Sequence, residues 1–254
     1  MRRTLQTIAL VILTSTGTAC AGGGHDQSGG HDHSGGFAAP SGGDTPAFDI
    51  IHTRITTKGN RATFHMAVTG TAGAVLPKKA GQLAGASVYS YVWPTSLDPA
   101  TVGFEAGAGI LAFAVTIHPD FDDTPLFDES ADGDLGNDGG RWHSHWVVLG
   151  PDKTCGPAAL KVIDIPKDTK PALPATWPGL PILIDSPGWT PVFSAEAVEV
   201  TVPFANIGAL KGAHFDGVAA GLRVNQSVHA PLLCVIDLFD AASGDLSLPG
   251  VVNE

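Results

Sequence analysis

Two histidines at alternate positions are the clearest sign of chemistry in this sequence. His143 and His145 lie in Arg141-Trp142-His143-Ser144-His145-Trp146-Val147-Val148-Leu149, whose apolar and β-branched residues predict a strand. Because successive side chains of a strand point to opposite faces, both imidazoles lie on one face. Such a pair can bind one transition metal if a neighbouring strand supplies a third ligand. The alternative is a pair of half-buried histidines that only pack beside the tryptophans.

The third ligand of such a site has several candidates, which are His52, His65, His118, His214 and His229. His118 ends a predicted strand just before an acidic loop, and His229 directly precedes another predicted strand, so we expect one of these two. His65 faces away from Met66 on its own strand, which disfavours a joint histidine-methionine copper site. The residue types do not decide between copper and zinc.

The run His143-Ser144-His145-Trp146 resembles the histidine-x-histidine-tryptophan strand of α-type carbonic anhydrases. The resemblance covers four residues. The chain has neither the context of that family's third histidine nor the threonine-rich loop of its zinc-water site, so no family is assigned from it. A zinc-dependent hydrolase or lyase stays among the functions to weigh.

An acidic run predicts a second, different metal site. Asp128-Glu129-Ser130-Ala131-Asp132-Gly133-Asp134 has the alternating oxygen ligands and the glycine of a calcium loop. Asp128, Ser130 and Asp132 would bind through their side chains and Asp134 through its carbonyl, while Asn137 or Asp138 would complete the shell. Gly139 stands where an EF-hand has its closing glutamate, and no helices flank the run. The alternative is a solvated turn.

Other catalytic motifs are missing from the sequence. It contains no Gly-x-Ser-x-Gly elbow, no phosphate-binding Gly-x-x-x-x-Gly-Lys and no Cys-x-x-Cys-His haem attachment. The neighbouring Asp122 and Asp123 are interpreted as loop or calcium-shell residues and not as a general acid and base. An enzyme is therefore the less favoured class.

The N-terminus predicts export. Met1-Arg2-Arg3 is followed by the apolar run Ile8–Leu13, too short to span a bilayer, and then by small residues up to Cys20. We expect residues 1–20 to be a signal segment and Cys20 a lipid anchor, with localisation in the periplasm or at the cell surface. Glycine occupies the position where a lipoprotein signal prefers a branched aliphatic residue, so ordinary cleavage after Ala21 is the alternative.

The remaining cysteines and the following segment fit that compartment. With Cys20 as the anchor, Cys155 and Cys234 are left as one predicted disulfide. Residues 21–47 are rich in glycine, serine, histidine and aspartate and are predicted to be a disordered tether, whose histidines suit weak metal capture.

Short strands must position the candidate ligands. Residues 48–254 are predicted to form a single all-β domain, an antiparallel β-sandwich or barrel with long Gly/Pro-rich loops. The chain has 32 glycines and 19 prolines, which leave room only for a brief helix near Asn206–Lys211. Residues 166–191, rich in proline, should be an ordered crossover loop. The predicted strands are Phe48–Ile55, Arg61–Thr69, Ser87–Trp93, Ile110–Ile117, Trp142–Leu149, Leu160–Ile165, Ala197–Phe204, Val218–Val224 and Leu232–Phe239.

The net charge of −11 disfavours a nucleic-acid partner and favours cations. The sequence therefore predicts an exported metal-binding protein that carries copper or zinc, with a structural calcium ion. The main alternative is a surface module without a transition metal, which calcium stabilises and which binds a ligand or has a structural role. Metal ions are the predicted partners, and the membrane is reached only through the lipid anchor.

Overall fold

The computed structural model of the chain describes residues 36–157, 159–225 and 231–253. They form fourteen strands and three short 3-10 helices, and none of these residues lies in an α-helix. Nor does this part of the chain contain a helix long and apolar enough to cross a membrane. The strands are β1 (Gly36–Ala38), β2 (Ile50–Lys58), β3 (Arg61–Val68), β4 (Ser87–Pro94), β5 (Ile110–Ile117), β6 (His143–Pro151), β7 (Leu160–Val162), β8 (Ile184–Asp185), β9 (Val192–Phe193), β10 (Ala197–Pro203), β11 (His214–Phe215), β12 (Val218–Val224), β13 (Leu233–Ala241) and β14 (Gly250–Val251).

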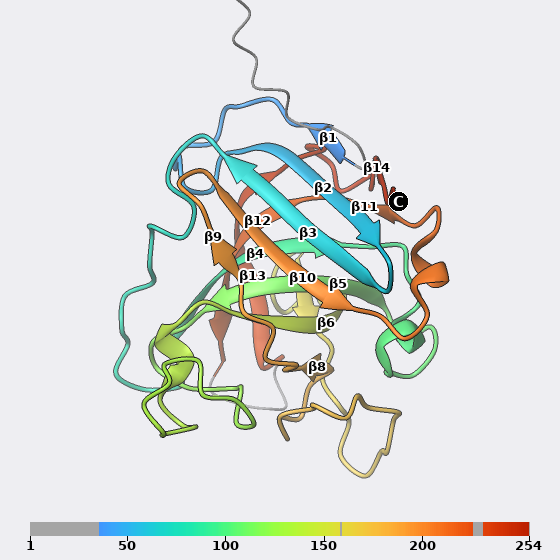
Figure 1. Ribbon diagram of the computed structural model, residues 1–254. Coiled ribbons are helices and arrows are strands. Elements are labelled where there is room, and N and C mark those ends of the chain that lie inside the picture. Colours follow the sequence, from blue (N-terminus) through green and yellow to red (C-terminus); the bar gives the residue numbers. More distant parts are fainter. Residues whose placement is uncertain (1–35, 158, 226–230, 254) are drawn as a thin grey trace, which may run out of the picture. The chain divides into compact units, whose positions relative to one another are not determined.

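The predicted all-β fold is confirmed, and it combines a sandwich with a barrel. Strands β5, β4, β12, β13, β7 and β6 pair in that order, and β6 pairs again with β5, which closes the ring. A second sheet, in the order β1-β2-β3-β10-β9, packs against the barrel wall (Figure 1). Each of the nine predicted strands overlaps an observed one, and the predicted helix is the 3-10 helix Ile207–Leu210.

Two hydrophobic cores follow from the alternation of side chains along the barrel strands. The outward side chains of β4, β5 and β6 are large, and Trp93, Phe113 and Trp146 pack with Phe64 of β3 between the barrel and the second sheet. The inward side chains of the same strands are small, mainly valine and alanine. The sandwich core is therefore filled by aromatic rings, whereas the barrel interior is lined by short side chains.

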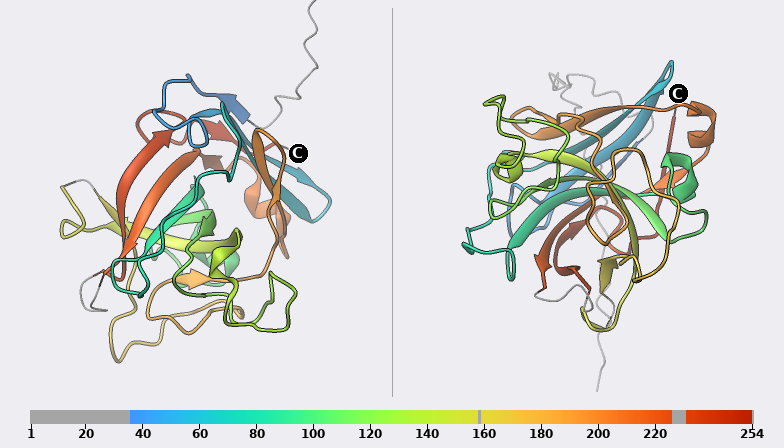
Figure 2. Two further views of the ribbon diagram at one scale, coloured as in Figure 1. Left: turned by 90° about the vertical axis from the view of Figure 1, so that its left-hand side faces the viewer. Right: turned by 90° about the horizontal axis from the view of Figure 1, so that it is seen from below.

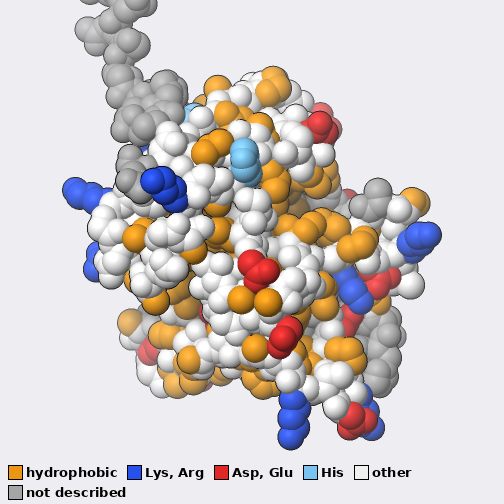
Figure 3. All heavy atoms as spheres, turned by 90° about the vertical axis from the view of Figure 1, so that its right-hand side faces the viewer, with side chains coloured by type: hydrophobic (Ala, Val, Ile, Leu, Met, Phe, Trp, Pro, Cys, Tyr) orange, Lys and Arg blue, Asp and Glu red, His pale blue; other side chains and the backbone are white. Residues whose placement is uncertain are grey.

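Long loops gather at one end of the barrel. The loop after β5 and the proline-rich loop before β8 lie at the same end in the two views (Figure 1; Figure 2, left). A hydrogen bond from Ser186 Oγ to the carbonyl oxygen of Asp123 joins them. On the face drawn in Figure 3, charged side chains are scattered among apolar and uncharged ones, in keeping with a charged content of 15%.

Residues 36–47 belong to the fold, which corrects the tether prediction for this part of the chain. β1 pairs with β2, and the buried Asp49 accepts hydrogen bonds from the amides of Gly42 and Gly43 and from the hydroxyls of Ser41 and Thr69. These contacts hold a segment whose composition alone predicts disorder. The rest of the tether, the signal segment and Cys20 lie outside the described residues.

The predicted disulfide is confirmed, and it lies between β7 and β13, the two neighbouring barrel strands with the fewest paired residues. β7 pairs with β13 through one residue pair, Lys161 with Cys234. The Cys155–Cys234 disulfide joins the same two regions across 79 residues of sequence. The Lys161 ammonium adds ion pairs to Asp152 at 3.0 Å and Asp164 at 2.7 Å.

Removing the disulfide should destabilise the barrel where β7 meets β13. For a closed loop of 79 residues, the chain-entropy model gives about 4.5 kcal/mol of stabilisation. We expect Cys155→Ala/Cys234→Ala to lower the free energy of unfolding by roughly that amount in denaturant titrations. A reductant should destabilise the parent but not the double variant. Alkylation of both thiols in the unreduced parent would contradict the prediction.

The Asp49 carboxylate should make stability depend on pH. Hydrogen bonds from Gly42 lower its pKa most, burial opposes them, and the other donors add to the lowering, from 3.8 to about 2. Because the pKa is lower in the folded state, this stabilisation is complete above pH 4 and is lost as the pH falls towards 2. Asp49→Asn should cost about 1 to 2 kcal/mol at neutral pH, from impaired hydrogen bonding, and little near pH 2.

The measurement is chemical unfolding of the parent and the variant between pH 2 and pH 7. Asp44→Asn is the matched control, because Asp44 is exposed in the same segment. A difference between Asp49→Asn and the parent that stays constant over this range would refute the assignment.

Candidate metal centre

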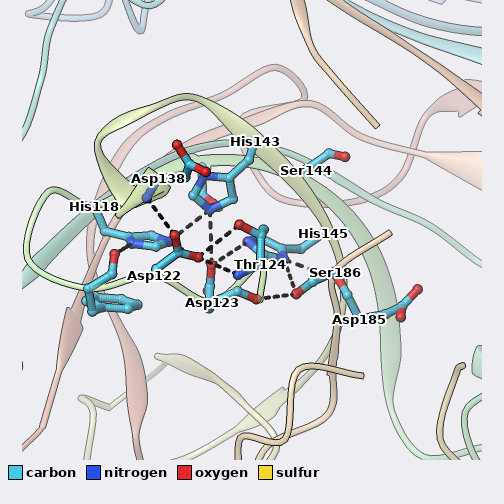
Figure 4. A network of polar contacts seen from close by, with 12 residues as sticks. His118, Asp122, Asp123, Thr124, Asp138, His143, Ser144, His145, Asp185 and Ser186 are labelled. Atoms are coloured by element: carbon cyan, nitrogen blue, oxygen red, sulfur yellow. Dashed lines mark hydrogen bonds and ion pairs between the residues drawn. The ribbon is translucent and has the colours of Figure 1, made fainter. Parts of the chain in front are cut away.

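Four buried side chains converge at the loop end of the barrel, namely His118, Asp123, His143 and His145 (Figure 4). Asp123 Oδ1 lies 3.1 Å from Nε2 of His118, 3.1 Å from Nε2 of His143 and 3.2 Å from Nε2 of His145. The Nε2 atoms of His118 and His143 are 2.9 Å apart. Within the described part of the chain, this is the one group of three or more His, Cys, Asp or Glu residues whose ligand atoms meet in this way.

Antiparallel pairing of β5 with β6 brings the histidines together. His143 lies opposite Thr116 and His145 opposite Ala114, so both imidazoles face the barrel interior from β6. His118 follows directly after β5. His143 and His145 therefore share a face, as predicted, and His118 lies beside them.

The loop after β5 delivers the fourth group, Asp123. The carboxylate of the preceding Asp122 accepts hydrogen bonds from the amide and hydroxyl of Thr124 and from the amide of Asp138. The carbonyl of Asp123 accepts the hydroxyl of Ser186. These bonds fix the backbone on both sides of Asp123, which leaves its carboxylate directed at the histidines (Figure 4).

Hydrogen bonds at the far side of each ring determine which nitrogen faces the centre. Nδ1 of His118 lies 2.9 Å from the Phe121 carbonyl, and Nδ1 of His143 lies 2.8 Å from the Arg141 carbonyl. Nδ1 of His145 is 3.2 Å from the carbonyl oxygen of Asp185. A carbonyl only accepts, so each Nδ1 carries a proton, which leaves Nε2 as the atom that can offer a lone pair to the centre.

Nitrogen lone pairs directed at one another need protons or a metal ion between them. Thr116 Oγ1, 3.1 Å from His143 Nε2, can donate to one of the three rings only. His145 Nε2 and Asp123 Oδ1 have no hydrogen-bond partner with acceptable angles among the described residues. Such orphaned buried atoms are costly, and a metal ion bound by all four groups would remove the cost.

The carboxylate is held in the ionised form that binds metals. Asp123 is 4% exposed and the three histidines are 1% exposed. Burial by itself raises the pKa of Asp123, but attraction to charged His118 and His145 and the short approaches of the rings outweigh burial, so the pKa lies well below its usual range.

The distances fit a small four-coordinate ion. With zinc-ligand bonds of 2.0 to 2.1 Å, the corners of a tetrahedron are about 3.3 Å apart. The three separations of Asp123 Oδ1 from the nitrogens and that of His118 Nε2 from His143 Nε2, which are 2.9 to 3.2 Å, lie just below that value, and all four ligand atoms lie within 4.8 Å of one another. A square arrangement would place one nitrogen opposite Asp123 at about 4 Å, whereas all three nitrogens lie close to it. The close approach of all three nitrogens to Asp123 is therefore unlike a square-planar arrangement.

The predicted calcium ligands do not converge on one point. The Asp128 carboxylate accepts hydrogen bonds from the amides of Asp132 and Gly133, and that of Asp138 accepts those of Glu129 and Ser130. The loop thus satisfies its own backbone with the side chains expected to bind calcium. The calcium site, which included Asp134, gains no support from this geometry and stays a prediction from sequence.

Gly139, which stands at the EF-hand glutamate position, has a steric reason to be glycine. A Cβ at this position would lie 1.6 Å from the carbonyl oxygen of Phe121 and 2.6 Å from that of His118. The Gly139 carbonyl also accepts a hydrogen bond from the His118 amide. The acidic loop therefore packs tightly against the turn that carries His118 and Asp123, and positions these two side chains.

The other histidines predicted as possible ligands lie elsewhere. His52 and His65 belong to β2 and β3 in the second sheet, where His65 Nδ1 is 2.8 Å from Glu199 Oε1, and His214 is exposed on β11. His229 lies outside the described residues. Asp123, which the sequence suggested as a loop or calcium-shell residue, instead lies with the three histidines, and the only signal for this in the sequence is its closeness to His118 in the chain.

Comparisons of the chain with protein-family models, curated proteins and solved structures find no match. The geometry of the four buried side chains is therefore the basis for assigning a function.

Gly139→Ala should disturb the centre without changing a ligand. The added methyl group must displace the turn between His118 and Asp123, which should cost about 1 to 3 kcal/mol of stability and weaken metal binding. Gly140→Ala is the matched control, because a Cβ there would meet no atom within 4 Å. Thermal unfolding and zinc titration of both variants provide the measurement, and equal behaviour of the two would refute this role of Gly139.

Proposed function

We propose that this protein binds one transition metal ion through His118, Asp123, His143 and His145, and that the ion is zinc. The observation that carries the proposal is the approach of Asp123 Oδ1 to within 3.2 Å of all three Nε2 atoms in a buried site. Three neutral imidazoles and one carboxylate are a ligand set that zinc accepts in tetrahedral geometry.

Copper is the less favoured of the two predicted metals. Copper(II) prefers a square or tetragonal arrangement, and copper(I) prefers sulfur ligands. Among the described residues, Met66 is buried in the sandwich core, and Cys155 and Cys234 form the disulfide. Neither the geometry nor the nearby donors therefore favour copper.

The proposed ion is a resident of the fold and not a cargo for delivery. Its four ligands are almost fully buried, and four protein ligands complete a tetrahedral shell, as is typical of sites that hold an ion. The alternative of a zinc hydrolase or lyase needs an open coordination position, so it ranks second. Hydrogen bonds to each Nδ1 support retention by orienting the rings.

We also propose that the protein works outside the cytoplasm. A disulfide within the fold is typical of oxidising compartments, and it accords with the basic and apolar N-terminal run in the sequence. Anchoring to the membrane through a lipid on Cys20, and weak metal capture by the histidines of residues 21–35, are part of this proposal.

Elemental analysis of the full chain without a purification tag tests the metal proposal. His25, His31 and His33 should first be replaced by alanine, so that tether histidines contribute no metal. We expect one zinc ion per chain in this background, and at least a tenfold loss of occupancy after Asp123→Ala or the double change His143→Ala/His145→Ala.

His214→Ala is the matched control, because His214 is an exposed histidine remote from the four ligands in the pairing of the sheets. It should keep the full zinc content. Circular dichroism should verify that each variant folds. A background protein that binds no transition metal, or ligand variants that bind as much as the control, would refute the proposal, and copper at one equivalent would refute the choice of zinc.

A further inference from the structure

The barrel encloses an apolar cavity of about 270 Å³ beside the metal centre. Its lining is dominated by valine, leucine and alanine from all six barrel strands. His118, Asp123 and His145 form one border of the cavity. Such an apolar space excludes water readily and accepts small apolar molecules.

One hydroxyl group in the described wall of the cavity has no partner. Ser90 lies on β4 between Val88 and Val92, and all three side chains line the cavity. Ser90 is fully buried, and its Oγ has no hydrogen-bond partner among the residues that the structure describes. A buried hydroxyl left unpaired costs about 1 to 3 kcal/mol, so a ligand group that hydrogen-bonds to it would bind favourably.

The polar groups are concentrated on one wall. Ser90 lies opposite Thr116, and Thr116 lies opposite His143, so these residues form one rung across β4, β5 and β6. The wall formed by β12, β13 and β7 contributes Ala220, Leu222, Leu233 and Val162, and is apolar. A ligand that matches both walls has a hydrocarbon body and one polar group.

An apolar rim gives access to the cavity. Ile236, Leu238 and Leu246 also line it, and their exposed fractions are 38%, 56% and 39%. Large aliphatic side chains exposed together at the mouth of a cavity suit the entry of an apolar molecule.

We infer that the barrel binds a small aliphatic molecule with a single uncharged hydrogen-bonding group, of the size and chemistry of a medium-chain alcohol. At about 30 Å³ for each water-sized group, the cavity holds roughly nine such groups, as many as the carbon and oxygen atoms of 1-octanol. Among the described residues, neither lysine nor arginine lines the cavity, so no basic side chain is present to pair with an anionic head, and a neutral head is favoured. The hydroxyl of the ligand pairs with Ser90, and the chain lies along β12 and β13.

Calorimetric titration of the full chain with 1-octanol, octanoate and benzene tests this inference. Benzene probes the apolar space without any hydrogen bond. We expect 1-octanol to bind more tightly than octanoate, and Ser90→Ala to weaken 1-octanol about tenfold while leaving benzene unchanged. Ser90→Ala should fold at least as stably as the parent, because it removes an unpaired buried hydroxyl.

Two further variants test the position of the ligand. Ala220→Leu fills the cavity beside Ser90, its partner in the pairing of β4 with β12, and should abolish binding of both probes. If that variant does not fold, Leu222→Ala provides the second measurement. This variant enlarges the cavity, so 1-decanol should have a higher affinity for it than for the parent. Failure of 1-octanol to bind the parent, equal binding to Ser90→Ala, or tighter binding of octanoate would overturn the inference.

The cavity and Ser90 do not depend on the metal proposal, and the experiment separates the two. His143→Ala should lose zinc but keep 1-octanol, because His143 is a proposed zinc ligand that does not line the cavity, and Ser90 and the apolar wall are unchanged. Loss of 1-octanol from this variant, verified to be folded, would overturn the assignment of the head group to Ser90. Absence of zinc from the parent would refute only the metal proposal.

Discussion

The pairing of β5 with β6 is the interaction on which the rest of this structure depends. Its seven register pairs, from Ile110 with Leu149 to Thr116 with His143, close six strands into a ring. Closure removes the free edges of both strands and turns one face of each towards a common interior. The same register brings His118, at the end of β5, next to the two histidines at the start of β6.

The two faces of the barrel strands then carry side chains of different size, and each face has a different role. Aromatic side chains such as Trp93 and Trp146 face the second sheet and fill the sandwich core, which stabilises the wall of the barrel. Short side chains such as Ala114 and Ala220 face inward and leave space. A rigid outer core thus permits an interior that is not fully packed, and the candidate metal centre borders that interior.

The acidic loop after β5 positions Asp123, although its composition predicts a calcium site. Its carboxylates accept hydrogen bonds from backbone amides of the same loop, and Asp122 fixes the backbone next to Asp123. A loop that satisfies its own polar groups can hold one carboxylate, that of Asp123, at a buried point among three imidazoles. The buried charge is tolerated there because cationic partners, either protonated histidines or a metal ion, are the groups it faces.

The sequence by itself determined the strands, the disulfide and the shared face of His143 and His145, because these follow from alternation along a strand and from cysteine number. It also favoured His118, which precedes the acidic loop. Only the tertiary structure decided that Asp123 completes the centre and that residues 36–47 join the fold. Both depend on contacts between segments distant in the chain, such as Ser186 with Asp123, which local patterns do not encode.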